Sequence, residues 1–225
     1  MSKKTFYTEL SYILGILSLA FGTALETYAN FGMSTAVAPA YLLHLKFSQT
    51  IPWFSFGIAE YCTQFCLLVL MILLMHRFKL SYLFSFITAI LYGLILDTFM
   101  KLVVVLPNVV AYRILAFAIG TLFVTAGVSL IFHTYISPEV YELFVAEVSF
   151  KFHIKVHVFK TEYDLTSCIV ALFMSFLFFS HIEGIGIGTI ISACINGTLI
   201  GWFTKLFERH FTFIDGMKLR SYFET

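Results

Sequence analysis

Six long runs of apolar residues constrain the fold of this chain more than any other feature of its sequence. They are Leu10 to Tyr28, Phe54 to Met75, Leu80 to Val105, Val109 to Phe132, Leu165 to Ser180 and Ile185 to Phe207. A helix that crosses a bilayer needs about 20 mostly apolar residues, and short connections join these runs. We therefore predict an all-α polytopic membrane protein in which residues 1–225 form a single membrane domain with six transmembrane helices.

The amino-acid composition supports the same class of protein. Hydrophobic residues make up 60% of the chain and charged residues 12%, against roughly 45–50% and about 25% in ordinary soluble domains. The 14 Lys and Arg nearly balance the 13 Asp and Glu, so the chain has no excess of basic charge with which to bind DNA or RNA. The expected partners are the lipid bilayer and a small-molecule solute, with no nucleic acid.

The distribution of basic residues predicts the orientation in the membrane. Six spans place both termini and the second and fourth connections on one side. That side holds eleven of the 14 cations, and only Lys46, Lys101 and Arg113 fall on the other. Because cytoplasmic loops carry the excess of Lys and Arg, both termini are expected in the cytoplasm. Residues 209–225 are then a cytoplasmic tail along the inner surface.

Sequence signatures of enzymes and cofactor sites are absent. The cysteines Cys62, Cys66, Cys168 and Cys194 all fall inside the predicted spans, where cysteine usually behaves as a small hydrophobe. No metalloprotease, nucleophile-elbow or phosphate-loop motif occurs in the chain. We expect no enzyme activity, no metal and no cofactor.

The second half of the chain resembles the first half. A shift of about 104 positions superimposes Gly93 on Gly197, Lys101 on Lys205 and Glu60 on Asp164. Nearly the same shift superimposes Gly15, Gly22 and Ser34 on Gly120, Gly127 and Ser137. The chain therefore divides into two repeats, one about residues 8–106 and the other about 109–208. Each repeat has three spans, an odd number, so the second repeat is expected to be inverted in the membrane.

Inverted repeats favour a transport function. Secondary transporters are commonly built in this way, with a solute site near the midplane where interrupted helices meet. The alternative is a duplicated membrane scaffold that moves no solute.

Each repeat also contains a short apolar segment after its first span. In the first repeat a turn from Asn30 to Ser34 precedes the segment, and in the second a turn from His133 to Ser137 does so. Ser137, Pro138 and Glu139 form a strong helix start, because a hydroxyl, a proline and an acid all favour the first turn. We predict two short helices, either re-entrant or lying at the membrane surface. Their starts supply the candidate solute-binding residues Asn30, Ser34, His133, Ser137 and Glu139.

Carboxylates within the apolar spans are the second functional signal. An ionisable residue in a membrane span is usually functional or paired. Glu26, Glu60 and Asp97 fall in the outer half under the predicted orientation, and Asp164 falls on the inner side. Our hypothesis is that one or two of the outer acids carry protons during transport, with Arg113 as the nearest cation. The alternative is a static ion pair, for example between Arg113 and Asp97.

A family resemblance agrees with this architecture. The residues that carry it are Gly22 to Leu25, Ala29 to Ser34, Pro39 with Tyr41, Gly93 to Asp97, Ser137 with Pro138, and Gly186 to Thr189. Together they resemble the YitT/YczE-like integral membrane proteins of bacteria, over about Leu10 to Leu206. The resemblance implies a multi-pass protein of the bacterial cell membrane and names no substrate.

Two functions are expected from these observations. The first is a small secondary transporter or exporter, driven by protons, for a small polar or anionic solute. The second is a substrate-binding or accessory membrane subunit that works with a separate partner. A homodimer is a further expectation, because Gly197 and Gly201 place two small residues on one helix face.

Overall fold

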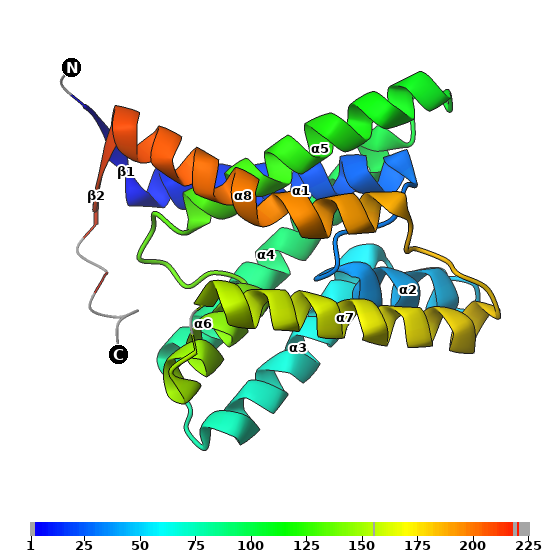
Figure 1. Cartoon of the computed structure of the whole chain (residues 1–225), viewed down its shortest axis with the longest axis horizontal. Coiled ribbons are helices and arrows are strands. Elements are labelled where there is room, and N and C mark those ends of the chain that lie inside the picture. Colours follow the sequence, from blue (N-terminus) through cyan, green and yellow to red (C-terminus); the bar gives the residue numbers. More distant parts are fainter. Residues whose placement is uncertain (1–2, 155, 218–219, 221–225) are drawn as a thin grey trace.

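The computed structural model describes residues 3–154, 156–217 and 220, with the backbone alone at residues 156 and 157. The chain is largely helical (Figure 1). Its helices are α1 (Thr8–Ala29), α2 (Ala38–Phe47), α3 (Phe56–Met75), α4 (Leu80–Val103), α5 (Val110–Ile131), α6 (Val140–Phe152), α7 (Val156–Phe179) and α8 (Ile187–His210). Six of them, all except α2 and α6, are long and apolar enough to cross a membrane. This confirms the predicted all-α polytopic class.

The fifth span begins earlier than its apolar run indicated. The apolar run predicts a start at Leu165, whereas α7 begins at Val156. The extra turns carry the charged residues Lys160, Glu162 and Asp164, so they do not belong to the apolar run. Within these turns the Nζ atom of Lys160 lies 3.2 Å from a carboxylate oxygen of Asp164, one helical turn further along. An ion pair at this spacing stabilises a helix, which favours the helical conformation of the polar turns.

Two short strands close the end of the molecule where both termini lie. β1 (Lys4–Tyr7) and β2 (Phe211–Ile214) pair in parallel, with Lys4 opposite Phe211. Figure 1 shows them side by side at the left of the bundle. Glu9, in the first turn of α1, accepts hydrogen bonds from the backbone N–H groups of Gly216 and Met217. The tail therefore crosses this face as a strand, a feature that the sequence did not predict; residues 218–219 and 221–225 of the tail lie outside the described residues.

Two pairs of glycines hold α1 against α5. A Cβ atom on Gly15 would lie 3.0 Å from the carbonyl oxygen of Gly127, and one on Gly127 would lie 2.7 Å from that of Gly15. Gly22 and Gly120 show the same reciprocal contact, at 2.6 and 2.9 Å. Real Cβ atoms essentially never lie less than 3.0 Å from another heavy atom of this kind. Glycine is therefore required for the close approach of the two helices.

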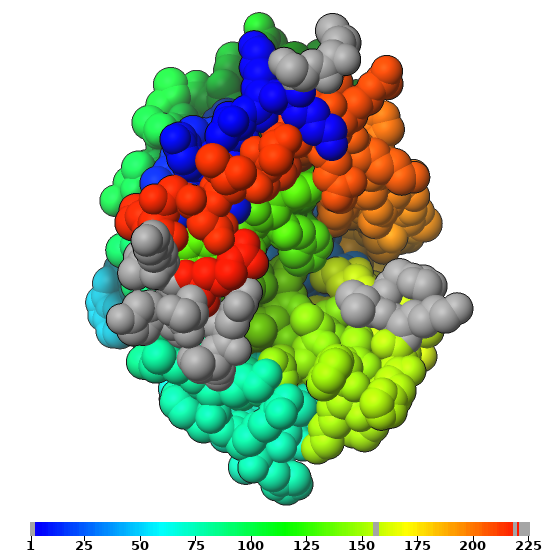
Figure 2. All heavy atoms as spheres, turned by 90° about the vertical axis from the view of Figure 1, so that its left-hand side faces the viewer, coloured from blue at the N-terminus to red at the C-terminus, as the bar shows by residue number. Residues whose placement is uncertain are grey.

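The remaining packing is similar in the two halves except at one place. α1 packs on α4, and α5 packs on α8. The short helices α2 and α6 each contact both α3 and α7. In the first half α3 packs closely on α4, but in the second half α7 and α8 make no comparable contact within the described chain. Figure 2, which views the end with the termini, shows this face hollowed between the orange atoms of α8 and the yellow-green atoms of α6 and α7.

Candidate functional site

The start of α6 lies inside the bundle, level with the middle of α3 and α4. Thr88 in α4 donates to the carbonyl oxygen of Ser137 at 2.9 Å, and Ser85 donates to that of Pro138. The turn before α6 therefore enters from the end with the termini, and α6 runs back toward that end. This placement fits a re-entrant helix. The helix begins at Val140 with Glu139 as its N-cap residue, two positions later than the cap predicted at Ser137.

Gln64 in α3 joins the start of α6 to two carboxylates. Its side-chain oxygen accepts the backbone N–H of Val140 at 3.1 Å. Because a backbone N–H can only donate, this bond fixes the orientation of the amide. The amide nitrogen then donates to Glu60 at 3.3 Å and to Glu139 at 3.1 Å. One NH₂ group thus bridges two carboxylates: that of Glu60, four residues away in the chain, and that of Glu139, 75 residues away.

Burial makes this arrangement unusual. Glu60 and Gln64 are 0% exposed and Glu139 is 3% exposed. Tyr141 donates a further hydrogen bond to Glu60 at 2.9 Å. The other carboxylate oxygen of Glu60 and that of Glu139 have no hydrogen-bond partner among the described residues. No ion pair joins either acid to a Lys, Arg or His of the described chain.

Two adjacent carboxylates without a cation need a compensating positive charge. Burying an isolated ionised carboxylate is very costly, so such groups bind a proton or a cation or pair with a base. Carboxylates that share a site cannot both ionise readily. We call Glu60, Gln64, Glu139 and Tyr141 the α3–α6 polar cluster. Its chemistry suits the reversible binding of a proton.

Glu26 forms a smaller buried site at the seam between α1 and α5. It is 0% exposed and accepts a hydrogen bond from Thr121 at 3.1 Å. Its second oxygen lacks a hydrogen-bond partner among the described residues. The hydroxyl of Tyr92, which donates to Thr23 at 3.0 Å, lies within electrostatic range of Glu26, Glu60 and Glu139. Tyr92 is thus a buried tyrosine on α4 whose hydroxyl is bonded to α1, the helix that carries Glu26.

Asp97 and Arg113 do not form the ion pair offered as the static alternative. Asp97 accepts from the hydroxyl of Ser55 at 2.5 Å and from the N–H of Gly57 at 2.8 Å, so it ties α4 to the start of α3. Arg113 donates instead to the carbonyl oxygens of Ala29 and Asn30 at 2.7 and 3.1 Å. It also lies 5.1 Å from the centre of the Phe31 ring. Arg113 thus holds the end of α1, which leaves it no role as the counter-ion of Asp97.

The other candidate residues are dispersed. Ser34 contributes its carbonyl oxygen, which accepts from Val37 and Ala38 before α2. His133 stacks on Phe213 of β2 at 4.2 Å between ring centres, which places it with the terminal strands. Asp164 faces Lys160 on α7. The structure therefore brings Glu60 and Glu139 together and places Ser34, His133 and Asp164 in other surroundings.

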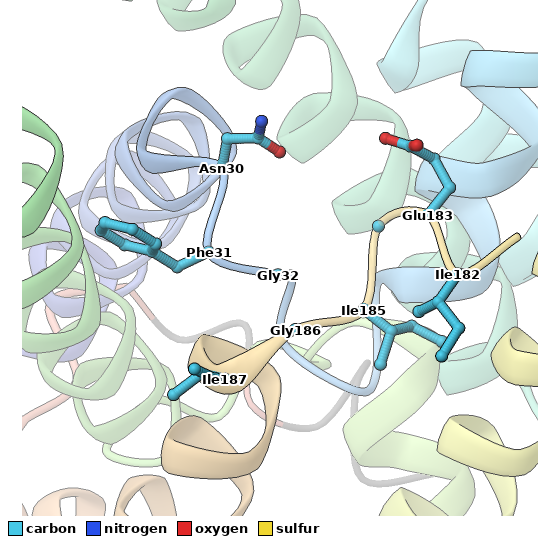
Figure 3. Close-up of a pocket in the computed structure, with 9 residues that line it drawn as sticks. Asn30, Phe31, Gly32, Ile182, Glu183, Ile185, Gly186 and Ile187 are labelled. Carbon is cyan, nitrogen blue, oxygen red and sulfur yellow. The ribbon is translucent and has the colours of Figure 1, made fainter. Parts of the chain in front are cut away.

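A pocket of about 300 Å³ opens at the end of the bundle opposite the termini. It lies between the turn after α1 and the connection from α7 to α8. Figure 3 shows the side chains of Asn30 and Glu183 directed toward each other across it, with Gly32 and Gly186 below. Among the ten predicted site residues, Asn30 is the one that lines this pocket.

Comparison with known proteins establishes the family. The model of DUF6198, a family of unknown function, matches residues 6–205. The chain belongs to this family. It matches no curated protein, and it matches no solved structure.

Sequence reasoning missed two members of the α3–α6 polar cluster in this DUF6198 protein. Gln64 was the stronger signal, because it is an amide within an apolar span and lies one turn after Glu60. Tyr141 was not distinguishable from other tyrosines of the apolar segments. No group of three or more His, Cys, Asp or Glu that would suit a metal ion occurs in the part of the chain that the structure describes.

Proposed function

We propose that this DUF6198 protein is a small secondary transporter, coupled to protons, for a small polar or anionic solute. The observation that carries the proposal is the α3–α6 polar cluster: two buried carboxylates share one amide at the start of a re-entrant helix and have no cation beside them. Intramembrane acids of this kind are typical of proton relays in transporters.

The proposal includes a duplicated, inverted architecture. Both halves have the order long helix, short helix, long helix, long helix. A two-fold axis that exchanges Gly15 with Gly120 and Gly22 with Gly127 turns the Gly15–Gly127 contact into the Gly22–Gly120 contact. The reciprocal distances at both glycine pairs support such an axis. Inverted repeats place the solute and coupling-ion sites near the repeat interface.

The proposed cycle depends on the charge of the α3–α6 polar cluster. Protonation removes charge from the pair, so the start of α6 can move through an apolar part of the bundle. Loss of the proton leaves a charged carboxylate, which needs the hydrogen bonds of the Gln64 amide and the Tyr141 hydroxyl at the start of α6. Movement of α6 is thereby linked to proton binding, which is the basis of coupling.

The membrane placement follows from the charge distribution. We propose that the protein lies in a bacterial cell membrane with both termini cytoplasmic, as the positive-inside rule indicates. Kinship with the YitT/YczE-like proteins is part of this proposal. Access of a protease or a thiol reagent to tags at either terminus, in intact cells and after permeabilisation, tests the orientation.

Reconstitution into liposomes tests the transport proposal. Vesicles loaded with a pH-sensitive dye receive mixtures of small amino acids and organic acids under an inward proton gradient. We expect solute-dependent proton uptake, reduced at least tenfold by Glu60→Gln and by Glu139→Gln. Glu162→Gln, an exposed residue of α7, is the matched control and retains the flux. Wild-type flux in both amide variants, with normal folding, would show that the cluster does not couple transport.

An accessory subunit is the second candidate function. The observation that favours it is an unoccupied glycine pair: a Cβ atom on Gly197 or Gly201 would have no described atom within 4 Å beyond its chain neighbours and its own helix backbone. Packing against the described residues therefore does not account for these glycines, and a second copy or a partner membrane helix would fit there. Flux by the purified protein alone argues against this function. Solute binding without flux, together with co-purification of another membrane protein, supports it.

A further inference from the structure

The pocket opposite the termini is built where the two halves of the chain interlock. The N–H of Met33 donates to the carbonyl oxygen of Gly184 at 2.9 Å, and the N–H of Gly188 donates to that of Phe31 at 2.7 Å. Gly32 has φ +104°, and a Cβ atom there would lie 2.4 Å from the nitrogen of Gly186. These contacts require glycine and fix the two segments below the pocket. The turn after α1 and the connection before α8 are therefore joined directly at the floor of the pocket.

The wall of the pocket carries one negative charge and one amide. Figure 3 shows Glu183 and Asn30 facing each other, while the Phe31 ring points away. One carboxylate oxygen of Glu183 contacts His181 at 3.0 Å, and the side chain of Asn30 makes no hydrogen bond to another described residue. Arg113 is directed to the carbonyl oxygens behind Asn30 and does not line the pocket. No Lys or Arg occurs among the lining residues.

The remaining lining suits a short aliphatic chain. Ile182, Ile185 and Ile187 contribute apolar side chains. A volume of about 300 Å³ corresponds to roughly ten water molecules in the liquid, at about 30 Å³ each. The pocket therefore has room for a small solute with one polar end.

We infer that this pocket binds a small solute through a primary ammonium group. The ammonium lies between the carboxylate of Glu183 and the amide oxygen of Asn30, and the aliphatic part lies against the isoleucines. An ammonium carries a positive charge and three N–H donors. It can therefore donate to both acceptors on the opposite walls of the pocket. This inference narrows the solute of the proposed transporter from a small polar or anionic molecule to a small polar molecule with a primary ammonium group, and it rests on that proposal only for the statement that the bound solute is then carried.

Titration of the full chain in detergent with n-butylamine hydrochloride tests the inference. Isothermal calorimetry measures the Kd, with n-butanol and sodium butyrate as probes of the same length without the ammonium. We expect saturable binding of the amine at neutral pH and at least tenfold weaker binding of the alcohol and the carboxylate. Equal binding of the three probes, or none, would overturn the inference.

Two variants separate the pocket from general effects of charge. Glu183→Gln removes the charge with little change of shape. Asn30→Gly removes the amide and retains the left-handed backbone conformation at φ 52°, which glycine adopts readily. Each variant is expected to raise the Kd at least tenfold, whereas Glu162→Gln leaves it unchanged. Unaltered affinity in Glu183→Gln contradicts the inference, and a thermal melt confirms that each variant is folded.

The binding experiment and the transport assay test separate statements. Amine binding without solute-dependent flux would remove the transport proposal and keep the ammonium site. Proton-coupled flux of other solutes, with no amine binding, would remove the ammonium site and keep the transport proposal.

Discussion

The pair α3 and α4 differs from its counterpart, the pair α7 and α8. In the first pair Gly57 and Gly93 permit close contact: a Cβ atom on Gly57 would lie 2.4 Å from the carbonyl oxygen of Gly93. Around this seam lies the α3–α6 polar cluster. In the second pair Gly197 is in open space, and buried polar atoms of Ser192 and Asn196 lack hydrogen-bond partners within the described residues.

This difference shows that two helix pairs matched by the 104-residue shift pack differently. The sequence shift that superimposes Glu60 on Asp164 also superimposes Gln64 on Cys168 and Thr88 on Ser192. Gln64, which fixes the start of α6, thus has a cysteine at the matching position, and the hydroxyl of Ser192, which matches Thr88, makes no hydrogen bond to a described residue. The first half is closed and bonded, and the second half is open. A transporter needs such asymmetry, because its two sides open in turn.

Replacement of Gln64 is expected to give the largest difference in stability between matched variants of the two helix pairs. Gln64→Leu removes the partner of Val140, Glu60 and Glu139 at once, and each buried group left unpaired costs about 1–3 kcal/mol. We expect a loss of about 3 kcal/mol or more in the free energy of unfolding. Cys168→Leu, at the equivalent position of α7, is the control and is expected to change stability far less. Thermal unfolding of both purified variants measures the difference, and equal losses would remove the contrast between the halves.

The glycines of the two helix pairs give the second test. Gly57→Ala forces α3 away from α4, and overpacking of this kind costs roughly 1–3 kcal/mol. Gly197→Ala adds a methyl group in open space, and alanine is favoured over glycine in a helix by roughly 0.5–1 kcal/mol. The Tm should therefore fall for the first variant and stay level or rise for the second. A fall in both would mean that α8 is packed against a neighbour in the membrane.

Equivalent hydroxyls of α4 and α8 give a smaller contrast. Thr88 bonds to Tyr12 at 2.7 Å and to the carbonyl oxygen of Ser137, so Thr88→Val should cost about 1–2 kcal/mol. The hydroxyl of Ser192 is buried and has no hydrogen-bond partner among the described residues, so Ser192→Ala should be neutral or slightly stabilising. Chemical or thermal unfolding distinguishes the two, and a large loss in Ser192→Ala would reveal a missing partner.

The smallest effect is expected at the far end of α6. Burial raises the pKa of Glu147, but hydrogen bonds from Lys79, Arg77 and Tyr82 outweigh it and hold the pKa below its usual value. A lowered pKa stabilises the folded state above the ordinary value near 4.5 and loses that contribution as the pH falls through the folded value. The contribution is that of a partly exposed pair, below about 1 kcal/mol. Glu147→Gln should flatten the fall of Tm below that pH, and an unchanged pH profile would contradict this.

The number and type of the helices could be predicted from the sequence, because apolar runs of the right length have few alternatives in a membrane. The start of α7 could not, since Lys160 and Asp164 satisfy each other along the helix and interrupt the apolar pattern. The strands were also missed. A strand of four residues has too little alternation to be recognised, and its pairing joins the two ends of the chain.

The candidate site was predictable in its residue types and not in its pairings. Burial of charge singled out Glu26 and Glu60, and both lie in the interior. Sequence position fixes the depth of a residue in a span but not the direction in which its side chain points. Arg113 therefore reached the end of α1 and not Asp97. Glu139 was predicted as part of a helix start, and only the fold placed it beside Glu60.

The strand pair also records the order in which the molecule is assembled. β1 is synthesised before all eight helices, and β2 is synthesised after them. Lys4–Tyr7 can therefore gain its partner only after α8 has been synthesised. Protection of the amide groups in β1 from hydrogen exchange would report that the first and last described elements of the chain have met.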